Sequence, residues 1–157
     1  MLTEGHELLW AEPAWLEAPE WGDLYEAMAL LYLARPGNFF ILHAITSLWG
    51  VEQLAHWLPP EHTRACIQHW WTASLAVAMV AGAAHDLPTA AAVRQLADQY
   101  AQPQEHLEPW DSIIARALVS EDEHNTKLTL ALRDADVRFP GRAALHGAAS
   151  HFFASFD

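Results

Sequence analysis

The sequence is poor in lysine and cysteine. Lysine occurs once, at Lys127, and arginine supplies the other basic side chains. Cysteine also occurs once, at Cys66, so no disulfide can form within the chain. Because Cys66 lies in an apolar stretch, we expect an inert, buried thiol. The HExxH, GxSxG and glycine-rich phosphate-binding motifs are missing, so the sequence carries none of these common catalytic signatures.

Positive charge is scarce relative to negative charge. The formal net charge is −12, with 8 basic and 20 acidic residues. Such a balance argues against nucleic acid and against an anionic membrane surface, because both partners require clustered Lys and Arg. The first ten residues lack the basic and apolar regions of a signal peptide. We therefore expect a cytoplasmic protein.

Apolar residues make up 52% of the chain, and the patterns of alternating residues typical of strands are few. Prolines separate apolar stretches of helical length. These features predict an all-α protein, a single compact bundle of six or seven helices formed by residues 1–157. The expected helices span about 22–34, 38–58, 59–84, 88–99, 109–119, 120–137 and 141–156.

Residues 65–84 contain no Asp, Glu, Lys or Arg. Their number is sufficient to span a bilayer. However, Gln68, His69, Thr72 and Ser74 interrupt the stretch, and much of the remainder is alanine. We therefore expect a helix buried in the protein core, with no membrane as partner.

The helix expected at 120–137 has a clear start. Ser120 followed by Glu123 is the pattern of a capping box, and acids in a first turn favour the helix dipole. On a helical wheel, His124 lies in the middle of the apolar face that Leu128 helps to form, and Lys127 lies at its edge. Since Glu121 and His124 make only one ExxH pair, a di-iron bundle has little support.

Lys127 has two interpretations. A lysine that is turned toward the core favours its neutral amine, which can take up CO2 as a carbamate and serve, with a histidine, in a mixed N and O metal site. Alternatively, lysine is scarce because of codon usage, and Lys127 pairs in solvent with Glu123 at i−4. The residues alone leave both alternatives open.

His43 lies in the stretch "NFFILHAITSLWGVEQLAHWL", which is apolar all round. A helix of this kind is normally buried, so we expect His43 inside, either as a metal ligand or as a satisfied core residue. The other eight histidines lack ligand-like spacing. Trp49, Trp70 and Trp71 are expected either to pack in the core or to line a pocket for an aromatic molecule.

Two segments, "FFILHAITSLWGVEQL" and "WDSIIARALVSEDEHNTKLTLAL", resemble the questin oxidase-like family over about Tyr25 to Arg138. The resemblance implies an all-helical oxygenase that acts on aromatic polyketides such as anthraquinones. Some relatives resemble Baeyer–Villiger-type ring-opening enzymes, for which NADPH is a candidate reductant. Others are iron-dependent dioxygenases with four histidines and a carboxylated lysine around the metal. His43, His124 and Lys127 match the ligands in the two motifs.

The sequence departs from the family in its length. Family members are usually about twice as long, and the "NH" and "HPLIH"-like motifs of their first half are missing here. The chain would then be a carboxyl-terminal half that needs a second chain or a homo-oligomer, or it would recruit other histidines such as His62 or His69, or it would be inactive. The alternative function is a non-catalytic helical module that binds a hydrophobic small molecule or a partner subunit.

Overall fold

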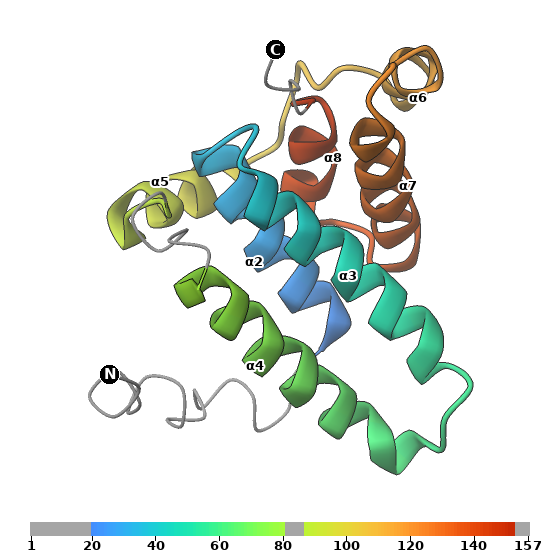
Figure 1. Ribbon diagram of the computed structural model, residues 1–157. Helices are drawn as coiled ribbons and strands as arrows, with labels where there is room; N and C mark the ends of the chain where they lie inside the picture. Colours follow the sequence, from blue (N-terminus) through green and yellow to red (C-terminus); the bar gives the residue numbers. More distant parts are fainter. Residues whose placement is uncertain (1–19, 81–86, 153–157) are drawn as a thin grey trace.

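The computed structural model describes residues 20–80 and 87–152 of the chain (Figure 1). These residues form seven α-helices and one short 3-10 helix, and they contain no strand. The elements are α2 (Trp21–Ala34), α3 (Phe39–Ala55), η2 (Pro60–His62), α4 (Thr63–Val80), α5 (Ala90–Tyr100), α6 (Trp110–Leu118), α7 (Glu123–Arg138) and α8 (Ala143–Ala149). The predicted all-α bundle is confirmed for this part of the chain.

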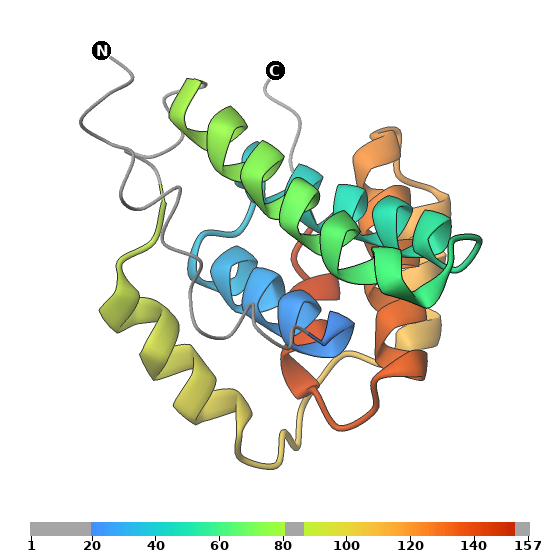
Figure 2. The same ribbon diagram turned by 90° about the horizontal axis from the view of Figure 1, so that it is seen from below.

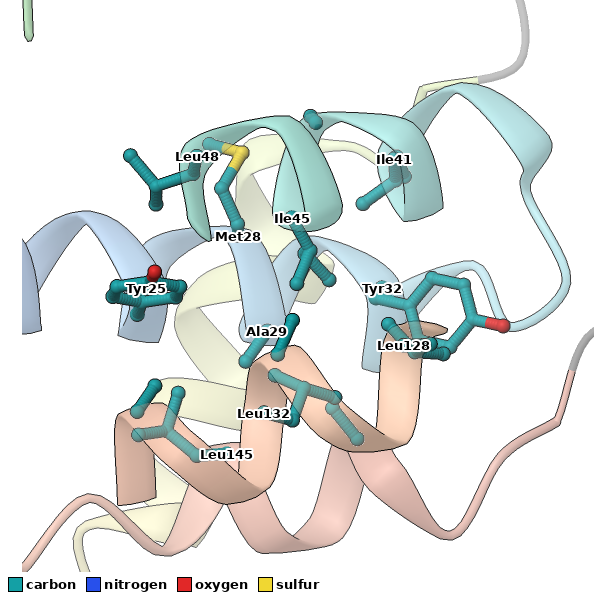
Figure 3. Close-up of a cluster of buried hydrophobic side chains, with 14 of the residues drawn as sticks. Tyr25, Met28, Ala29, Tyr32, Ile41, Ile45, Leu48, Leu128, Leu132 and Leu145 are labelled. Atoms are coloured by element: carbon teal, nitrogen blue, oxygen red, sulfur yellow. The ribbon is translucent and has the colours of Figure 1, made fainter. Parts of the chain in front are cut away.

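Helix α2 runs through the middle of the bundle. It packs against α3, α5, α7 and α8, and Figure 2 shows these helices arranged around it. The close-up in Figure 3 shows side chains from α2, α3, α7 and α8 in one apolar cluster, among them Tyr25, Ala29, Tyr32, Ile41, Ile45, Leu48, Leu128, Leu132 and Leu145. Removal of this apolar surface from water is the main force that holds the helices together.

A network of buried and half-buried charged and polar groups links α2, α3 and α7. Glu52 of α3 is only 1% exposed. It accepts a hydrogen bond of 2.7 Å from the Tyr25 hydroxyl and forms an ion pair with Arg138. Arg138 also donates to Asp134 at 2.8 Å, and the Trp49 ring nitrogen donates to the same oxygen at 2.7 Å. Burial, together with the hydrogen bond to Glu52, raises the pKa of Tyr25 well above its ordinary value.

Helix α4 lies at the surface, so the prediction that this stretch is buried in the core is wrong. The helix packs against α3 and η2, and of its side chains up to residue 77 only Ile67 and Trp70 are buried. Apart from Val77, its exposed side chains are polar or are alanine, which limits the apolar area that meets water. Cys66 is half-buried rather than buried. No helix in the two described ranges is long and apolar enough to cross a membrane.

The helix ends agree with the sequence at some positions and not at others. Asn38 caps α3 as predicted, because its side chain accepts a hydrogen bond of 2.9 Å from the Ile41 amide. Helix α8 ends at Ala149, earlier than predicted. Its last turn is tightened by hydrogen bonds from the Ser150 hydroxyl and amide to the Gly147 carbonyl. Residues 81–84 and 153–156 of the predicted helices lie outside the described residues.

Candidate functional site

His43 of α3 and His124 of α7 lie side by side. Their ring centroids are 5.1 Å apart. The ring of Phe39, one turn before His43, contacts both imidazoles, with centroid distances of 4.1 Å to His43 and 5.1 Å to His124. The structure thus brings together two of the three residues that the sequence proposes as metal ligands.

The prediction that His43 is inside the protein is wrong. The imidazole is exposed, and on the same side of α3 Phe39 exposes 48% of its surface and Leu54 exposes 66%. The opposite side, with Ile45 and Leu48, is fully buried against α2. An apolar helix can still present one face to solvent when its neighbours pack only on the other faces. The imidazole pair is therefore reachable from outside.

Asp122, rather than Ser120, caps α7, so the predicted capping box is not formed. One oxygen of the Asp122 carboxylate accepts a hydrogen bond of 2.8 Å from the His124 amide and lies 2.7 Å from the His124 Nδ1 atom. Ser120 instead accepts a hydrogen bond from the Asn125 side chain at 3.0 Å. The sequence signal that was missed is an aspartate, itself a favoured N-cap, two positions before a histidine.

In each of the two imidazoles, the Nδ1 atom is held by an oxygen acceptor. The Nδ1 atom of His43 lies 2.8 Å from the Phe39 carbonyl oxygen. A carbonyl oxygen can only accept a hydrogen bond, so Nδ1 of His43 carries the hydrogen. The contact of His124 with the Asp122 carboxylate favours the same tautomer. In a neutral imidazole, the lone pair then resides on Nε2. A histidine that ligates a metal through one nitrogen is typically held through the other in this way.

Lys127 does not lie in the protein interior. Its side chain is 57% exposed, and its Nζ atom forms an ion pair with Glu123 at 2.7 Å. The hydrogen bond from Lys127 lowers the pKa of the Glu123 carboxyl. This arrangement matches the second interpretation of the sole lysine. The carbamate at Lys127 stays a prediction.

The spacing of the two imidazoles allows a shared metal ion, and it also lies in the ordinary range of contact between two aromatic rings. A metal about 2.0–2.1 Å from each Nε2 lies roughly 3.2 Å from each ring centroid, so two imidazoles at the tetrahedral angle have centroids about 5.2 Å apart. The observed separation is 5.1 Å. Among the described residues, however, no group of three or more His, Cys, Asp or Glu side chains is placed to hold a metal.

The remaining histidines are placed elsewhere. His56, His62, His69, His106 and His151 are exposed. His146 lies 2.7 Å from the Glu108 carbonyl and stacks on Trp110, next to a surface hollow of about 350 Å3 that the imidazole pair does not line. His6 and His85 lie outside the described residues.

The tryptophans discussed above belong to the core rather than to a pocket at the histidines. Trp70 is buried, and Trp49 and Trp71 pack against the core. The Trp70 ring nitrogen donates a hydrogen bond of 3.1 Å to Ser47.

The comparisons with known proteins agree with the two motifs. A family model described as questin oxidase-like matches residues 6–132, a range that includes His43, His124 and Lys127. The match begins nearer the amino end than the predicted range of Tyr25 to Arg138. The prediction that the chain corresponds to the carboxyl-terminal half of a family member is therefore wrong. No curated protein and no solved structure matches the chain. The chain belongs to the questin oxidase-like family.

Proposed function

We propose that the protein is a metal-dependent oxygenase of the questin oxidase-like family, with His43 and His124 as two ligands of a non-haem iron ion. The observation that carries the proposal is the pair of adjacent imidazoles, each held through Nδ1 by an oxygen acceptor. Neutral imidazole suits iron, and a ferrous ion supplies the one-electron chemistry that dioxygen needs to react with an organic molecule.

The residues around the imidazoles suit an aromatic substrate. Phe39 contacts both rings and exposes 48% of its surface. An exposed aromatic face next to the metal position favours offset stacking of a second aromatic ring. We therefore propose that the substrate is an aromatic polyketide-type ring that is opened or cleaved by oxidation. NADPH stays a prediction as the reductant.

Lys127 is not part of the proposed ligand set. Its amine is exposed and paired with the Glu123 carboxylate. The role of Lys127 is then to hold a surface charge pair one turn beyond His124.

The test compares iron binding and oxygen uptake in matched variants. Wild-type protein, His43→Ala, His124→Ala and the control His69→Ala are loaded with Fe2+ without oxygen, desalted and analysed for iron. Oxygen uptake is then followed with a hydroxyanthraquinone. Wild type and the His69 variant are expected to keep iron and consume oxygen, and the other two variants to lose both. Equal iron retention in all four proteins would contradict the proposal.

A second function is favoured by a different surface. Trp57 is 88% exposed, and Leu54 and Leu58 beside it expose 66% and 44%. Exposed tryptophan and leucine are typical of sites that bind a partner or a hydrophobic molecule. A non-catalytic binding module would lose association on Trp57→Ala while the histidine variants behave like wild type.

A further inference from the structure

A surface hollow lies between the end of α5, the loop that follows it, and the helices α7 and α8. Its volume is about 350 Å3, near the lower end of the roughly 300–1,000 Å3 that small-molecule sites occupy. Its size and its mixture of polar and apolar lining are suited to a small molecule with a polar end and a short apolar part. The polar lining consists of Tyr100, Gln104, Asp136, Arg142 and His146, and the apolar lining includes Pro103, Leu107 and Ala143.

The polar side chains of the hollow are held in place by the rest of the protein. The Trp110 ring nitrogen donates a hydrogen bond of 2.9 Å to Asp136 Oδ2, and the same ring stacks on His146 with centroids 4.6 Å apart. Tyr100 packs directly on Gly147, where an added Cβ atom would lie 2.5 Å from the Tyr100 hydroxyl oxygen. Side chains that are fixed before binding lose little conformational entropy when a ligand arrives.

Arg142 does not make the hollow a site for an anion. Its Nη2 atom donates to the Asp23 carboxylate at 2.6 Å, and its Nε atom lies 3.5 Å from the Glu26 carboxylate. The guanidinium also packs closely on Gly22, where an added Cβ atom would lie 2.8 Å from Arg142 Cζ. Two carboxylates therefore offset the charge of this one guanidinium.

Two further residues of the hollow have already used their hydrogen-bond donors. The Gln104 side-chain nitrogen donates to the carbonyl oxygens of Gln99 and Gln102 at 2.8 and 2.9 Å. His146 Nε2 lies 2.7 Å from the Glu108 carbonyl oxygen and therefore carries the hydrogen, because a carbonyl can only accept. The groups that remain are the Gln104 amide oxygen and Nδ1 of the neutral His146 ring, and both are acceptors.

Asp136 and Tyr100 supply two more groups that can accept a hydrogen bond. Asp136 uses one oxygen, Oδ2, for Trp110 and for Arg133 at 3.7 Å. Its other oxygen and the Tyr100 hydroxyl form no hydrogen bond with residues 20–80 or 87–152. Of the four remaining groups in the hollow, only the Tyr100 hydroxyl can also donate a hydrogen.

The charges around the hollow favour a cation. The carboxylates of Asp23, Glu26 and Asp136 outnumber the guanidiniums of Arg133 and Arg142, and the chain as a whole has a formal net charge of −12. Such a surface attracts cations and repels anions. A primary ammonium ion carries three N–H donors and no acceptor, so it matches both the charge and the acceptors of the hollow.

We infer that this hollow binds a small primary ammonium ion with a short aliphatic chain. The ammonium group donates hydrogen bonds to the second oxygen of Asp136 and to the other acceptors of the hollow, and the chain contacts Pro103 and Leu107. His43 and His124 do not line the hollow, so the inference goes beyond the proposed function and does not depend on it.

NMR titrations with three small ions test the inference. Butylammonium, tetramethylammonium and butyrate are added to 15N-labelled wild-type protein at constant ionic strength, and the amide signals are followed. We expect saturable shifts with butylammonium at residues 100–104 and 141–147. Tetramethylammonium has the charge but no N–H donor, so it is expected to bind about tenfold more weakly, and butyrate is expected not to bind there. Shifts that map elsewhere or do not saturate, or equally tight binding of either other ion, would overturn the inference.

Variants of single acceptors extend the test. Asp136→Asn keeps an oxygen for Trp110 but removes the negative charge, so butylammonium is expected to bind about tenfold more weakly. Tyr100→Phe removes only the hydroxyl, and a loss of about threefold is expected. The control Asp98→Asn changes the same charge on an exposed residue of α5 outside the lining, and its affinity is expected to stay within about twofold of wild type.

Circular dichroism establishes that each variant is folded. Folded Asp136→Asn and Tyr100→Phe proteins that both bind butylammonium like wild type would overturn the inference, as would an equal loss in the Asp98→Asn control.

Discussion

One oxygen of the Asp122 carboxylate meets both the backbone and the side chain of His124. Asp122 Oδ1 accepts the His124 amide at 2.8 Å and lies 2.7 Å from His124 Nδ1. The start of α7 and the orientation of the imidazole are therefore set by one group. A carboxylate in this position raises the basicity of a ligating histidine.

Variants of Asp122 distinguish its role as the N-cap of α7 from its role in orienting the His124 imidazole. Asp122→Ala removes both, and we expect a loss of about 1 kcal/mol of stability and a reduction of roughly tenfold in Co2+ affinity. Asp122→Ser keeps a capping oxygen and shortens the side chain, so stability is expected to stay near wild type while affinity falls. Urea denaturation and a Co2+ titration measure the two effects. Equal affinity in all three proteins would show that the carboxylate does not support the ligand.

Lys127→Ala tests whether the lysine is a ligand. Because the ion pair with Glu123 is exposed, the expected loss of stability is close to zero. Metal affinity is expected to stay within about threefold of wild type, since the proposed ligands remain. Lys127→Arg serves as the control that keeps the charge. Loss of metal binding in both variants would instead point to a carbamate ligand.

Glu52 is expected to dominate the stability of the contact between α3 and α7. Glu52→Ala leaves Arg138 without its buried partner and the Tyr25 hydroxyl without its acceptor. Loss of one partner of a fully buried ion pair typically costs about 3–5 kcal/mol. Because Arg138 is partly exposed and keeps its ion pair with Asp134, we expect a cost at the lower end, about 3 kcal/mol. Urea denaturation measures the loss. Gln53→Ala, one position along α3 and only partly buried, is the control and should cost less than about 1 kcal/mol. A similar loss of stability in both variants would contradict the expectation that Glu52 dominates the stability of this contact.

A glycine within α3 offers a gain in stability. A Cβ atom at Gly50 would meet no other atom within 4 Å, so Gly50→Ala is expected to stabilise the protein by about 0.5–1 kcal/mol. Gly37, with φ of 78°, is the contrasting position. Gly37→Ala is expected to destabilise the protein by about 1 kcal/mol, because L-residues rarely adopt that conformation. Thermal unfolding of the two variants checks both signs.

Glu108 is expected to give stability that depends on pH. Hydrogen bonds from Ser112 and Arg116 lower the pKa of the Glu108 carboxyl from its ordinary value of 4.5. Because the pKa of this carboxyl is lower in the folded than in the unfolded protein, the stabilisation that Glu108 provides is complete above about pH 4.5. This stabilisation is lost as the pH falls through the lowered pKa. Glu108→Gln should therefore be less stable than wild type at pH 7, and the difference should vanish in strong acid. A difference that persists there would contradict this account.

The sequence predicts the helices well because their periodicity, caps and prolines are local signals. The buried face of α7, with Leu128, Leu132 and Ala135, also follows from the helical wheel. The sequence does not say which faces of an apolar helix have neighbours, and for this reason α4 and the His43 side of α3 were expected inside. Glu52 was overlooked because its partner Arg138 lies 86 residues away. A lone acid in an otherwise apolar helix was the available signal.

The meeting of His43 with His124 is the part of the site that the sequence predicts through its two motifs. The position of Lys127 could not be decided in advance, because an edge position on the wheel allows the long side chain to turn either way. The ion pair with Glu123 at i−4 decides it in favour of solvent.

The most direct test of the account follows the histidine ring nitrogens by NMR. Long-range correlation spectra of protein labelled with 15N identify the tautomer of each imidazole and the nitrogen that binds a metal. Before metal is added, His43 and His124 are expected to carry the hydrogen on Nδ1. On addition of Zn2+, the Nε2 signals of these two residues should shift together, while those of His56, His62 and His69 stay in place. Zn2+ that shifts other histidines, or only one of the pair, would contradict a shared metal site.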